Sequence, residues 1–574
     1  MRGKTLRFLL LLATLMLVIA AAGCGGDDDE GAAPTGTAEE GEGQAGGTLV
    51  FGSSADPVVL DFALISDGES YRVMLQMYET LIQLKPGTTE LEPGLATEWE
   101  SNEDGTAWTF TLREGVNFHD GTPFNAEAVC ANFERWYNFK GSFQNASATY
   151  YWQYGFGGGF AEPEEGAVGP EDSIYKSCEV VDDTHVTLNL TRPSATILQG
   201  LTLGPLSMQS PAAMEEFGAN EGEVDEDGVF HPTGTYGTEH PSGTGAFKFE
   251  SWTREDRLVL VRNEDYWGEK ALLDRLIFRP IADNAARLQA LQTGEIDGYD
   301  LVEPQDIPTI EGDDNFQILD RPAFNVAYVS FNISTPPLDD IEVRKAIAHG
   351  LDRQAVVDNF YGGRGEVATQ FMPPQLEGWA DDVPTYEFDP EKAKQILTDA
   401  GYDLPVEIEF WWPSDVTRPY MPDPKRNFEA FRASLEQSGF KVVPKSAPWD
   451  PDYIGLSDEG LQPLHLIGWT GDYGDPDNFI GTFFQTDNAQ FGLDKSDELD
   501  PVQEILNQAE IETDQAKRTE LYMEANRMIM EILPGVPYAH TKPAVAFKAN
   551  VKGYVPSPVD NQSFATVYLE GGGE

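Results

Sequence analysis

Two stretches of the chain alternate strictly between apolar and polar residues. Residues 108–112 read WTFTL, and residues 406–410 read VEIEF. An apolar–polar period of two is typical of a strand with one buried face and one solvated face. The pattern therefore predicts half-buried strands at both places.

Other segments repeat apolar residues at helical spacing and end on helix-terminating residues. Asp389 and Pro390 open one of them, and Gly401 follows its last turn. An Asp cap, a Pro in the first turn and a Gly after the end are the usual boundary signals of a helix. Residues 341–351 keep the same spacing, and Asp283 and Gly294 bound a third helix. The buried face predicted for the first helix consists of Ala393, Ile396, Leu397 and Ala400.

Strand and helix signals are mixed throughout the chain from Gly47 onward. This mixture predicts an α/β architecture. The length of 574 residues favours two or more domains. Hydrophobic residues make up 40% of the chain and aromatic residues 11%, which is enough for a large core and argues against a disordered protein.

The first 23 residues are typical of an export signal. Arg2, Lys4 and Arg7 precede an apolar run over residues 8–22, and the segment ends in Ala-Ala-Gly before Cys24. This end is similar to a bacterial lipobox, although Ala21 stands where such motifs usually carry Leu. We therefore predict a signal peptide over residues 1–23 and a lipid on Cys24. An ordinary cleaved signal with an incidental cysteine is the alternative.

Residues 24–46 contain no large apolar residue. They are rich in Gly, Ala, Asp and Glu, a composition typical of a solvated linker. We predict a disordered acidic tether between the lipid on Cys24 and the folded chain. The protein would then be exported and held at the outer face of the cell membrane.

Two further cysteines, Cys130 and Cys178, follow the tether. A helix predicted over residues 127–137 holds Cys130. In an exported protein such a pair favours a disulfide, and two buried free thiols are the alternative. No CxxC motif is present, so a zinc site of that type is excluded.

The charge balance is strongly acidic. The chain has 38 Lys and Arg against 97 Asp and Glu, a formal net charge of −59. Nucleic-acid binding needs a basic footprint that this chain lacks. Electrostatic adhesion to anionic lipid is disfavoured for the same reason.

Common catalytic signatures are missing from the sequence. It has no HExxH, no GxSxG, no P-loop and no GxGxxG after a strand, and its seven histidines are scattered. We therefore expect a protein that is not an enzyme, with no catalytic residues, no cofactor and no metal site.

Several blocks of sequence then point to one family. Residues 91–129 read LEPGLATEWESNEDGTAWTFTLREGVNFHDGTPFNAEAV, residues 240–252 read HPSGTGAFKFESW, and residues 468–484 read GWTGDYGDPDNFIGTFF. With residues 260–270, 288–300 and 324–357, these blocks resemble the family 5 extracellular solute-binding proteins in the expected order. That family serves ABC importers of peptides and nickel. The resemblance covers nearly the whole chain after the tether.

The resemblance implies a two-lobed clamshell, the periplasmic-binding-protein fold, with an extra subdomain in lobe I. The chain would cross between the lobes near Arg321–Asn325 and return near His540–Pro543. The expected boundaries are residues 47–322 and 542–574 for lobe I, about 78–209 for its subdomain, and 323–541 for lobe II.

The resemblance also implies a binding site for a peptide zwitterion. Asp472 matches the acid that receives the peptide ammonium, and Arg418 matches the arginine that receives its carboxylate. A guanidinium suits a bidentate grip on a carboxylate. Tyr420 is expected to donate a hydrogen bond to the ligand, Trp469 to wall the pocket, and Asp475 to be a structural turn residue. Without the resemblance, a turn acid and a surface arginine would be the simpler interpretations of Asp472 and Arg418.

These residues predict the capture of short peptides, dipeptides foremost, and their delivery to an ABC permease by a monomeric lipoprotein. Lobe I would add lid contacts near Ser53–Asp56 and Tyr71. Oligopeptides, glutathione, haem or a nickel chelate are alternative ligands within the family. An extracellular peptidase, or an adhesin or signalling receptor on the same scaffold, are alternatives of other classes.

Overall fold

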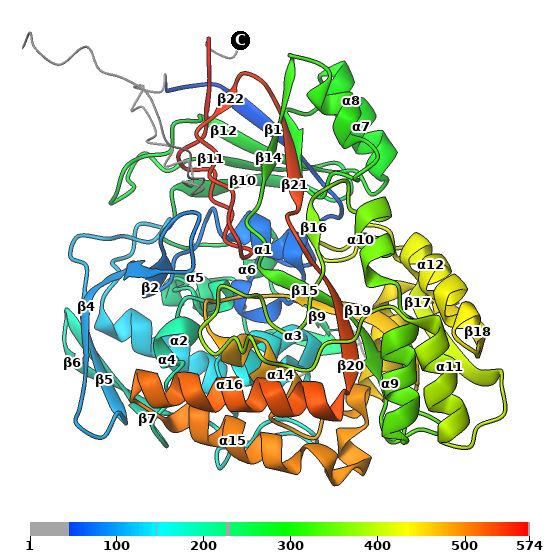
Figure 1. The fold of residues 1–574 in the computed structure, drawn as a ribbon. Coiled ribbons are helices and arrows are strands. Elements are labelled where there is room, and N and C mark those ends of the chain that lie inside the picture. Colours follow the sequence, from blue (N-terminus) through cyan, green and yellow to red (C-terminus); the bar gives the residue numbers. More distant parts are fainter. Residues whose placement is uncertain (1–44, 145, 225–229, 572–574) are drawn as a thin grey trace, which may run out of the picture. The chain divides into compact units, whose positions relative to one another are not determined.

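The computed structural model describes residues 45–144, 146–224 and 230–571 (Figure 1). The predicted signal peptide, Cys24 and the predicted tether up to residue 44 lie outside these ranges. Within them, no helix combines the length and the apolar character needed to cross a bilayer.

The first large sheet gathers strands from the start, the middle and the end of the chain. Its seven strands run in the order β10-β11-β12-β1-β13-β21-β14. β1 is parallel to β12 and β13, and β21 is antiparallel to β13 and β14. The strands are β1 (Thr48–Ser53), β10 (Phe247–Thr253), β11 (Arg257–Arg262), β12 (Arg275–Pro280), β13 (Gly298–Tyr299), β14 (Phe316–Asp320) and β21 (Ala544–Lys548). Helices α7 (Asn284–Thr293) and α8 (Ile307–Glu311) accompany it.

The second large sheet has six strands in the order β16-β20-β15-β19-β17-β18. β19, β17 and β18 are parallel neighbours. The strands are β15 (Asn325–Phe331), β16 (Gly365–Glu366), β17 (Val406–Pro413), β18 (Phe440–Ala447), β19 (Leu464–Thr470) and β20 (Gly535–Thr541). The helices of this part are α9 (Ile341–Gly350), α10 (Arg353–Phe360), α11 (Pro390–Asp399), α12 (Pro424–Gln437), α13 (Ile454–Asp458), α14 (Ile480–Phe484), α15 (Asp500–Ile511) and α16 (Gln515–Ile532).

A smaller antiparallel sheet, in the order β4-β5-β7-β6, forms the subdomain beside the first large sheet. Its strands and main helix are β4 (Ala96–Ser101), β5 (Ala107–Leu112), β6 (Tyr175–Asp182), β7 (His185–Leu190) and α2 (Ala126–Tyr137). The remaining elements include α1 (Gly68–Met74), β2 (Ile82–Leu84), β3 (Leu91–Pro93), α3 (Ala146–Tyr150), a π-helical turn η3 (Tyr151–Gly155), α4 (Ile197–Gly200), α5 (Pro211–Glu216), β8 (Gly222–Val224), β9 (Phe230–Pro232), α6 (Tyr236–Glu239), β22 (Val551–Lys552) and β23 (Tyr568–Leu569).

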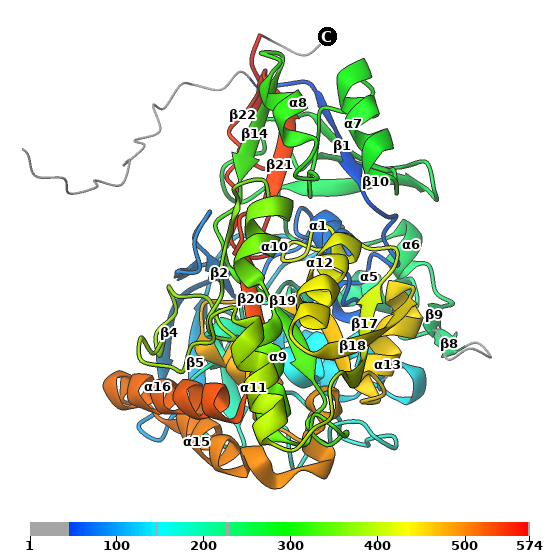
Figure 2. The same ribbon diagram turned by 45° about the vertical axis from the view of Figure 1, so that its right-hand side comes forward.

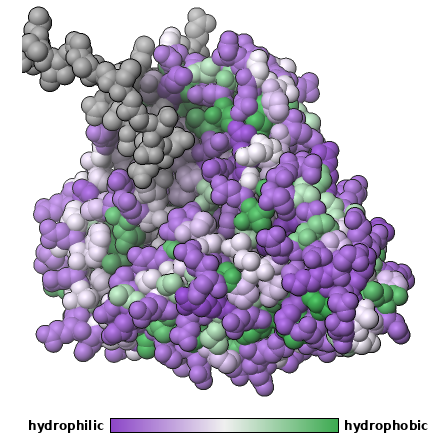
Figure 3. All heavy atoms as spheres, viewed as in Figure 1, coloured by the Kyte–Doolittle hydropathy of each residue, from purple (hydrophilic) through white to green (hydrophobic). Residues whose placement is uncertain are grey.

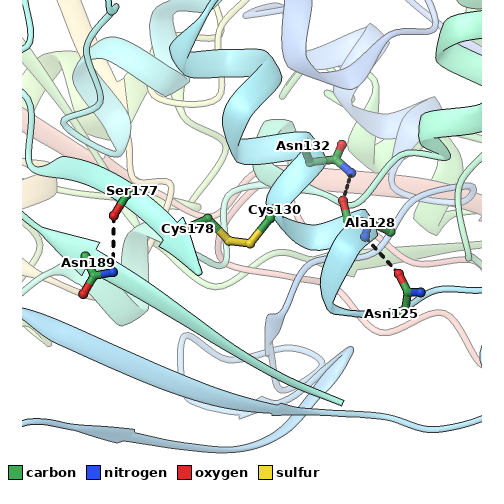
Figure 4. The surroundings of a disulfide bond; sticks show 7 residues. All are labelled: Asn125, Ala128, Cys130, Asn132, Ser177, Cys178 and Asn189. Atoms are coloured by element: carbon green, nitrogen blue, oxygen red, sulfur yellow. Dashed lines mark hydrogen bonds between the residues drawn. A yellow bond between two sulfur atoms is a disulfide. The ribbon is translucent and has the colours of Figure 1, made fainter. Parts of the chain in front are cut away.

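A disulfide joins this subdomain's helix to its sheet. Cys130 on α2 and Cys178 on β6 point toward one another (Figure 4), and their Cα atoms are 5.2 Å apart. Of the two interpretations of this cysteine pair, the disulfide is confirmed.

Separate hydrophobic cores fill the two large parts. One core joins the seven-stranded sheet to the subdomain, and Phe51 and Trp136 are both fully buried in it. The other packs around the six-stranded sheet. We call the first part lobe I and the second lobe II. The two contact each other, because Tyr473 of lobe II packs in the first core and Leu84 of lobe I packs in the second.

The chain passes between the large sheets twice, from β14 to β15 and from β20 to β21. The two crossings are tied together, because the side-chain amide of Asn325 donates to the Thr541 carbonyl at 3.1 Å and accepts from its N–H at 3.0 Å. The numerical lobe and subdomain boundaries given above stay predictions.

The helix predicted after Asp389 is confirmed, together with its N-terminal cap and its terminal glycine. Asp389 caps α11 by accepting from the N–H of Lys392, and Gly401 has a φ of 90° just after the helix. The prediction for Ala400 is wrong: this residue is the exposed C-cap, so the buried face stops at Leu397. On the face shown in Figure 3, hydrophilic residues predominate and hydrophobic ones form small separate patches, as the acidic composition leads one to expect.

Candidate ligand-binding site

The predicted anchors lie on loops at the same edge of the six-stranded sheet. Arg418 follows the carboxyl end of β17, and Asp472 follows the carboxyl end of β19. These two strands are parallel neighbours, so both loops leave the sheet on one side. Asn325, where the chain enters the sheet from lobe I, pairs with Thr470 at the end of β19. The anchors therefore face the crossings between the lobes.

Asp472 is a partly buried carboxylate that no described basic side chain pairs with. Its Oδ2 accepts from the Asn478 amide at 3.2 Å, and its Oδ1 accepts from the Tyr151 hydroxyl at 3.1 Å. Burial raises the pKa of Asp472 to about 7, and the negative charge of Asp560 adds to that rise. The hydrogen bonds from Asn478 and Tyr151 lower the pKa. A cation placed beside this carboxyl group would stabilise its ionised form.

Asp475, three residues further on, has a different environment. Its carboxylate makes a bidentate ion pair with Arg518, at 2.6 and 2.8 Å, and both side chains are buried. It also caps the short helical turn of residues 476–478 by accepting from the N–H of Asp477. Asp475 is thus a structural turn residue, as expected, and its negative charge is already paired with the positive charge of Arg518.

Trp469, near the end of β19, lies beside Asp472. Its indole N–H points to the Asn478 side-chain oxygen at 3.3 Å, and the same oxygen accepts from the backbone N–H of Asp472 at 2.7 Å. The Trp469 ring lies 6.5 Å from that of Tyr150 and 6.0 Å from that of Phe483. These contacts place an aromatic wall next to the carboxylate.

Arg418 is a partly buried cation without an ion pair among the described residues. Its guanidinium stacks over the Trp449 ring at 4.1 Å, and its Nε has no hydrogen-bond partner there. The backbone of Arg418 bonds that of Met421 in both directions, at 3.2 and 3.0 Å. Stacking on an aromatic face favours a cation and leaves the guanidinium N–H donors free for an anion.

Tyr420 is the link between the two anchor loops. It is 5% exposed, and its ring lies so close to Gly468 that a methyl group there would collide with it. Burial raises the pKa of Tyr420 to about 12, against a lowering effect of the nearby Arg418 charge. Its carbonyl accepts from the Tyr361 hydroxyl at 3.1 Å. The hydrogen bond from Tyr420 to a ligand stays a prediction.

Lobe I approaches the site mainly through aromatic residues that the sequence reasoning missed. Tyr150 and Tyr151 come from the α3–η3 segment, and Tyr71 of α1 packs on Tyr151 at 5.8 Å between ring centroids. Tyr71 was an expected lid residue. The other expected lid segment is engaged inside lobe I, since Ser54 donates to Glu69 at 2.6 Å and Asp56 accepts from the Trp252 indole at 3.0 Å.

A cavity of about 430 Å³ lies next to the Arg418 loop. Residues 303–305 line one part, and residues 413–417 and 422–426 line another. Neither Arg418 nor Asp472 lines it, so we place the candidate site by the two anchors and not by this cavity. Within the described ranges, no group of three or more His, Cys, Asp or Glu is arranged to hold a metal ion.

An α/β fold of two lobes, with candidate ligand anchors beside the crossings between them, is that of the clamshell solute-binding proteins. The comparisons agree. Residues 90–491 match the family model described as bacterial extracellular solute-binding proteins, family 5 Middle. The chain belongs to this family of transport proteins, whose members bind solutes and are not enzymes.

Individual relatives differ in what their names say they bind. The chain is 32% identical to the dipeptide-binding protein of Escherichia coli, over 91% of this chain and 95% of that protein. It is also 32% identical to heme-binding protein A of Haemophilus influenzae, over 93% and 94% of the two chains. Among solved structures it is similar to an ABC transporter-associated periplasmic binding protein of Helicobacter pylori in complex with the peptide STSA. That match has 30% identity, a TM-score of 0.76, and coverage of 92% and 99% of the two chains.

Proposed function

We propose that the protein captures short peptides, dipeptides foremost, between its two lobes and delivers them to the permease of an ABC importer. One observation carries the proposal: the carboxyl group of Asp472 and the guanidinium of Arg418, neither with an ion pair among the described residues, follow neighbouring strands at the same edge of one sheet. A free peptide is a zwitterion, and burying it requires one anion and one cation at a fixed separation.

The two anchors are sufficient in energy only together with the backbone hydrogen bonds of the peptide. A hydrogen bond to a charged group contributes about 1.5–3 kcal/mol net. Two such anchors, with backbone bonds to an extended peptide, reach the approximately −8 kcal/mol of micromolar binding. Trp469 and Tyr150 supply apolar walls that are tolerant of different side chains.

The carboxylate of Asp472 favours a peptide ligand over haem and a nickel chelate. Proteins similar to this chain carry names or titles that specify a dipeptide, a tetrapeptide and heme. An ammonium group explains the uncompensated carboxylate of Asp472, whereas haem and a nickel chelate bring no ammonium of their own. The dipeptide preference follows from the matched anchors for both peptide termini.

The wider setting is part of the same proposal. Lobe I spans residues 47–322 and 542–574, lobe II spans residues 323–541, and the ligand stabilises their closed arrangement by its differential affinity. The protein acts as a monomer at the outer face of the cell membrane. A diacylglycerol on Cys24, joined to the folded chain by the acidic tether, holds the protein there. Its two acyl chains matter because one chain alone binds a membrane only marginally.

Native mass spectrometry of the purified protein, followed by calorimetric titration with dipeptides to pentapeptides, tests the proposal. Asp472→Asn and Arg418→Ala are each expected to weaken dipeptide binding at least tenfold. Matched controls are Asp487→Asn and Arg426→Ala, which change exposed residues of the same types. Unchanged affinity in both anchor variants, or no binding of any peptide, contradicts the proposal. Peptides recovered uncleaved exclude a peptidase.

A further inference from the structure

The hydroxyl of Tyr151 reaches Asp472 from the opposite lobe. Its oxygen lies 3.1 Å from Oδ1 of Asp472, across 321 positions of sequence. Tyr151 packs against the core of the seven-stranded sheet and the subdomain, whereas Trp469, which adjoins Asp472, packs against the core of the six-stranded sheet. This hydrogen bond therefore bridges the two lobes at the ammonium anchor itself.

Tyr151 is held in place by its own lobe. It begins the π-helical turn η3, a rare element that occurs frequently at functional sites. Its ring lies 5.8 Å from Tyr71 and 5.4 Å from Tyr150, and the Tyr71 hydroxyl accepts from the N–H of Gly204 at 2.7 Å. The hydroxyl of Tyr151 is thus presented by a packed aromatic group and not by a loose side chain.

The surroundings of Asp472 show why the hydroxyl group of Tyr151 matters as a hydrogen-bond donor. Tyr151, Tyr150 and Tyr71 face it from lobe I, Tyr473 adjoins it in lobe II, and Asp560 acts on it from the C-terminal segment. The carboxylate of Asp560 is itself bound to Arg321 at 3.0 Å. Among the described residues, none of the groups that shift the pKa of Asp472 is a cation. The side-chain donors to its carboxylate are Asn478, from its own lobe, and Tyr151.

We propose that Tyr151 is a positioning residue that fixes the Asp472 carboxylate toward the ligand ammonium and completes the anchor only when the lobes are closed. Asn478 and Tyr151 each occupy one lone pair of a different carboxylate oxygen. A second lone pair on each oxygen stays available for the ammonium. The inference rests on the proposed peptide-binding function and adds a lobe I group to it.

Tyr151→Phe is the direct test, because it removes only the hydroxyl group. Binding of alanyl-leucine by the full-length protein is measured calorimetrically from pH 5 to pH 8.5. The variant should bind about tenfold more weakly at pH 7, where it loses a hydrogen bond to a charged group. The loss of affinity at low pH should also begin at a higher pH in this variant, because the hydrogen bond from Tyr151 lowers the pKa of Asp472. A merely structural role of Tyr151 would not change that pH.

Tyr154→Phe is the matched control. Tyr154 lies in the same π-helical turn, is 53% exposed, and makes no hydrogen bond to Asp472, so the affinity and the pH profile of this variant should equal those of the wild type. N-acetyl-alanyl-leucine, which lacks the ammonium, should bind poorly to every variant. Identical pH profiles for Tyr151→Phe and the wild type overturn the inference and leave peptide binding intact.

A measurement without ligand separates the two proposals. Small-angle X-ray scattering of the empty protein should give a larger radius of gyration for Tyr151→Phe than for the wild type, because a bond between the lobes is lost. Absence of dipeptide binding by the wild type contradicts the proposed function. An unchanged radius of gyration in Tyr151→Phe contradicts the positioning role, whatever the ligand proves to be.

Discussion

The affinity for peptides should depend on pH through the ionisation of Asp472. In the ligand-free structure, where Tyr151 of lobe I contacts Asp472, burial raises the pKa of this carboxyl group to about 7. A bound ammonium requires the ionised form, so the proton on Asp472 competes with the ligand. Lowering the pH through 7 therefore weakens binding. The ligand has its own limit at the other end, because a peptide ammonium loses its proton near pH 8.

The size of the effect follows from the pKa. The apparent dissociation constant rises by a factor of one plus ten to the power of pKa minus pH. With a pKa of about 7, that factor is about 2 at pH 7, about 11 at pH 6 and about 100 at pH 5. Binding should be tightest between about pH 7 and 8. Near pH 7, complex formation should release about half a proton from Asp472.

Isothermal titration calorimetry with a dipeptide checks both the pH dependence of the affinity and the release of protons. The affinity gives the pH profile, and titrations in buffers of different ionisation enthalpy give the number of protons released. In Asp472→Asn the acid limb should disappear, together with most of the affinity. An affinity that stays constant for the wild type between pH 5 and 7 refutes the reasoning, because Asp472 would then not carry the ammonium or would not be protonated in the empty site.

Other consequences concern stability. The folded-state pKa of Asp472 exceeds the ordinary 3.8, so ionisation of this carboxyl group destabilises the folded protein as the pH rises from about 4 to 7. Without ligand, the Asp472→Asn variant should therefore unfold at a higher temperature than the wild type. The difference in unfolding temperature should grow from about pH 4 to 7 and then stay level. Gly468→Ala should lower the free energy of unfolding in urea by about 1–3 kcal/mol and weaken peptide binding, because the added methyl collides with the Val326 carbonyl and with the Tyr420 ring. Unchanged peptide binding would show that Tyr420 does not support the anchor. Cys130→Ser with Cys178→Ser should lower the unfolding free energy of the subdomain by about 2–4 kcal/mol, since the bond closes a loop across 48 positions. Equal urea midpoints for the reduced and oxidised proteins would contradict that value.

Local chemistry decided which elements could be predicted from the sequence. The helix after Asp389 was predictable because its cap and its terminal glycine act within a few residues. Ala400 was misjudged because apolar spacing alone does not show that the helix axis ends before it. The order of strands in the two sheets had no such signal, since β1 pairs with strands more than 200 residues away.

The same distinction holds for the candidate site. Asp472 and Arg418 could be nominated from the sequence because the resemblance matched both to ligand-binding residues of the family, and their roles stay predictions. Tyr151 was not, because its significance comes from a contact across 321 positions and not from its neighbours in sequence. Asn478 carries only the ordinary signature of a turn residue, and nothing in its own segment indicates that it orients Asp472.

The parallel pairing of β17 with β19 has a kinetic consequence. Both candidate anchor loops leave neighbouring parallel strands of one sheet, so we expect their separation to stay the same when the lobes move relative to each other. Under the proposed function, a peptide would first bind both anchors while the lobes are apart, and a ligand of the wrong length would dissociate before the lobes close. Selection and capture become successive steps, and stopped-flow rates should saturate with peptide concentration at the rate of the closing step.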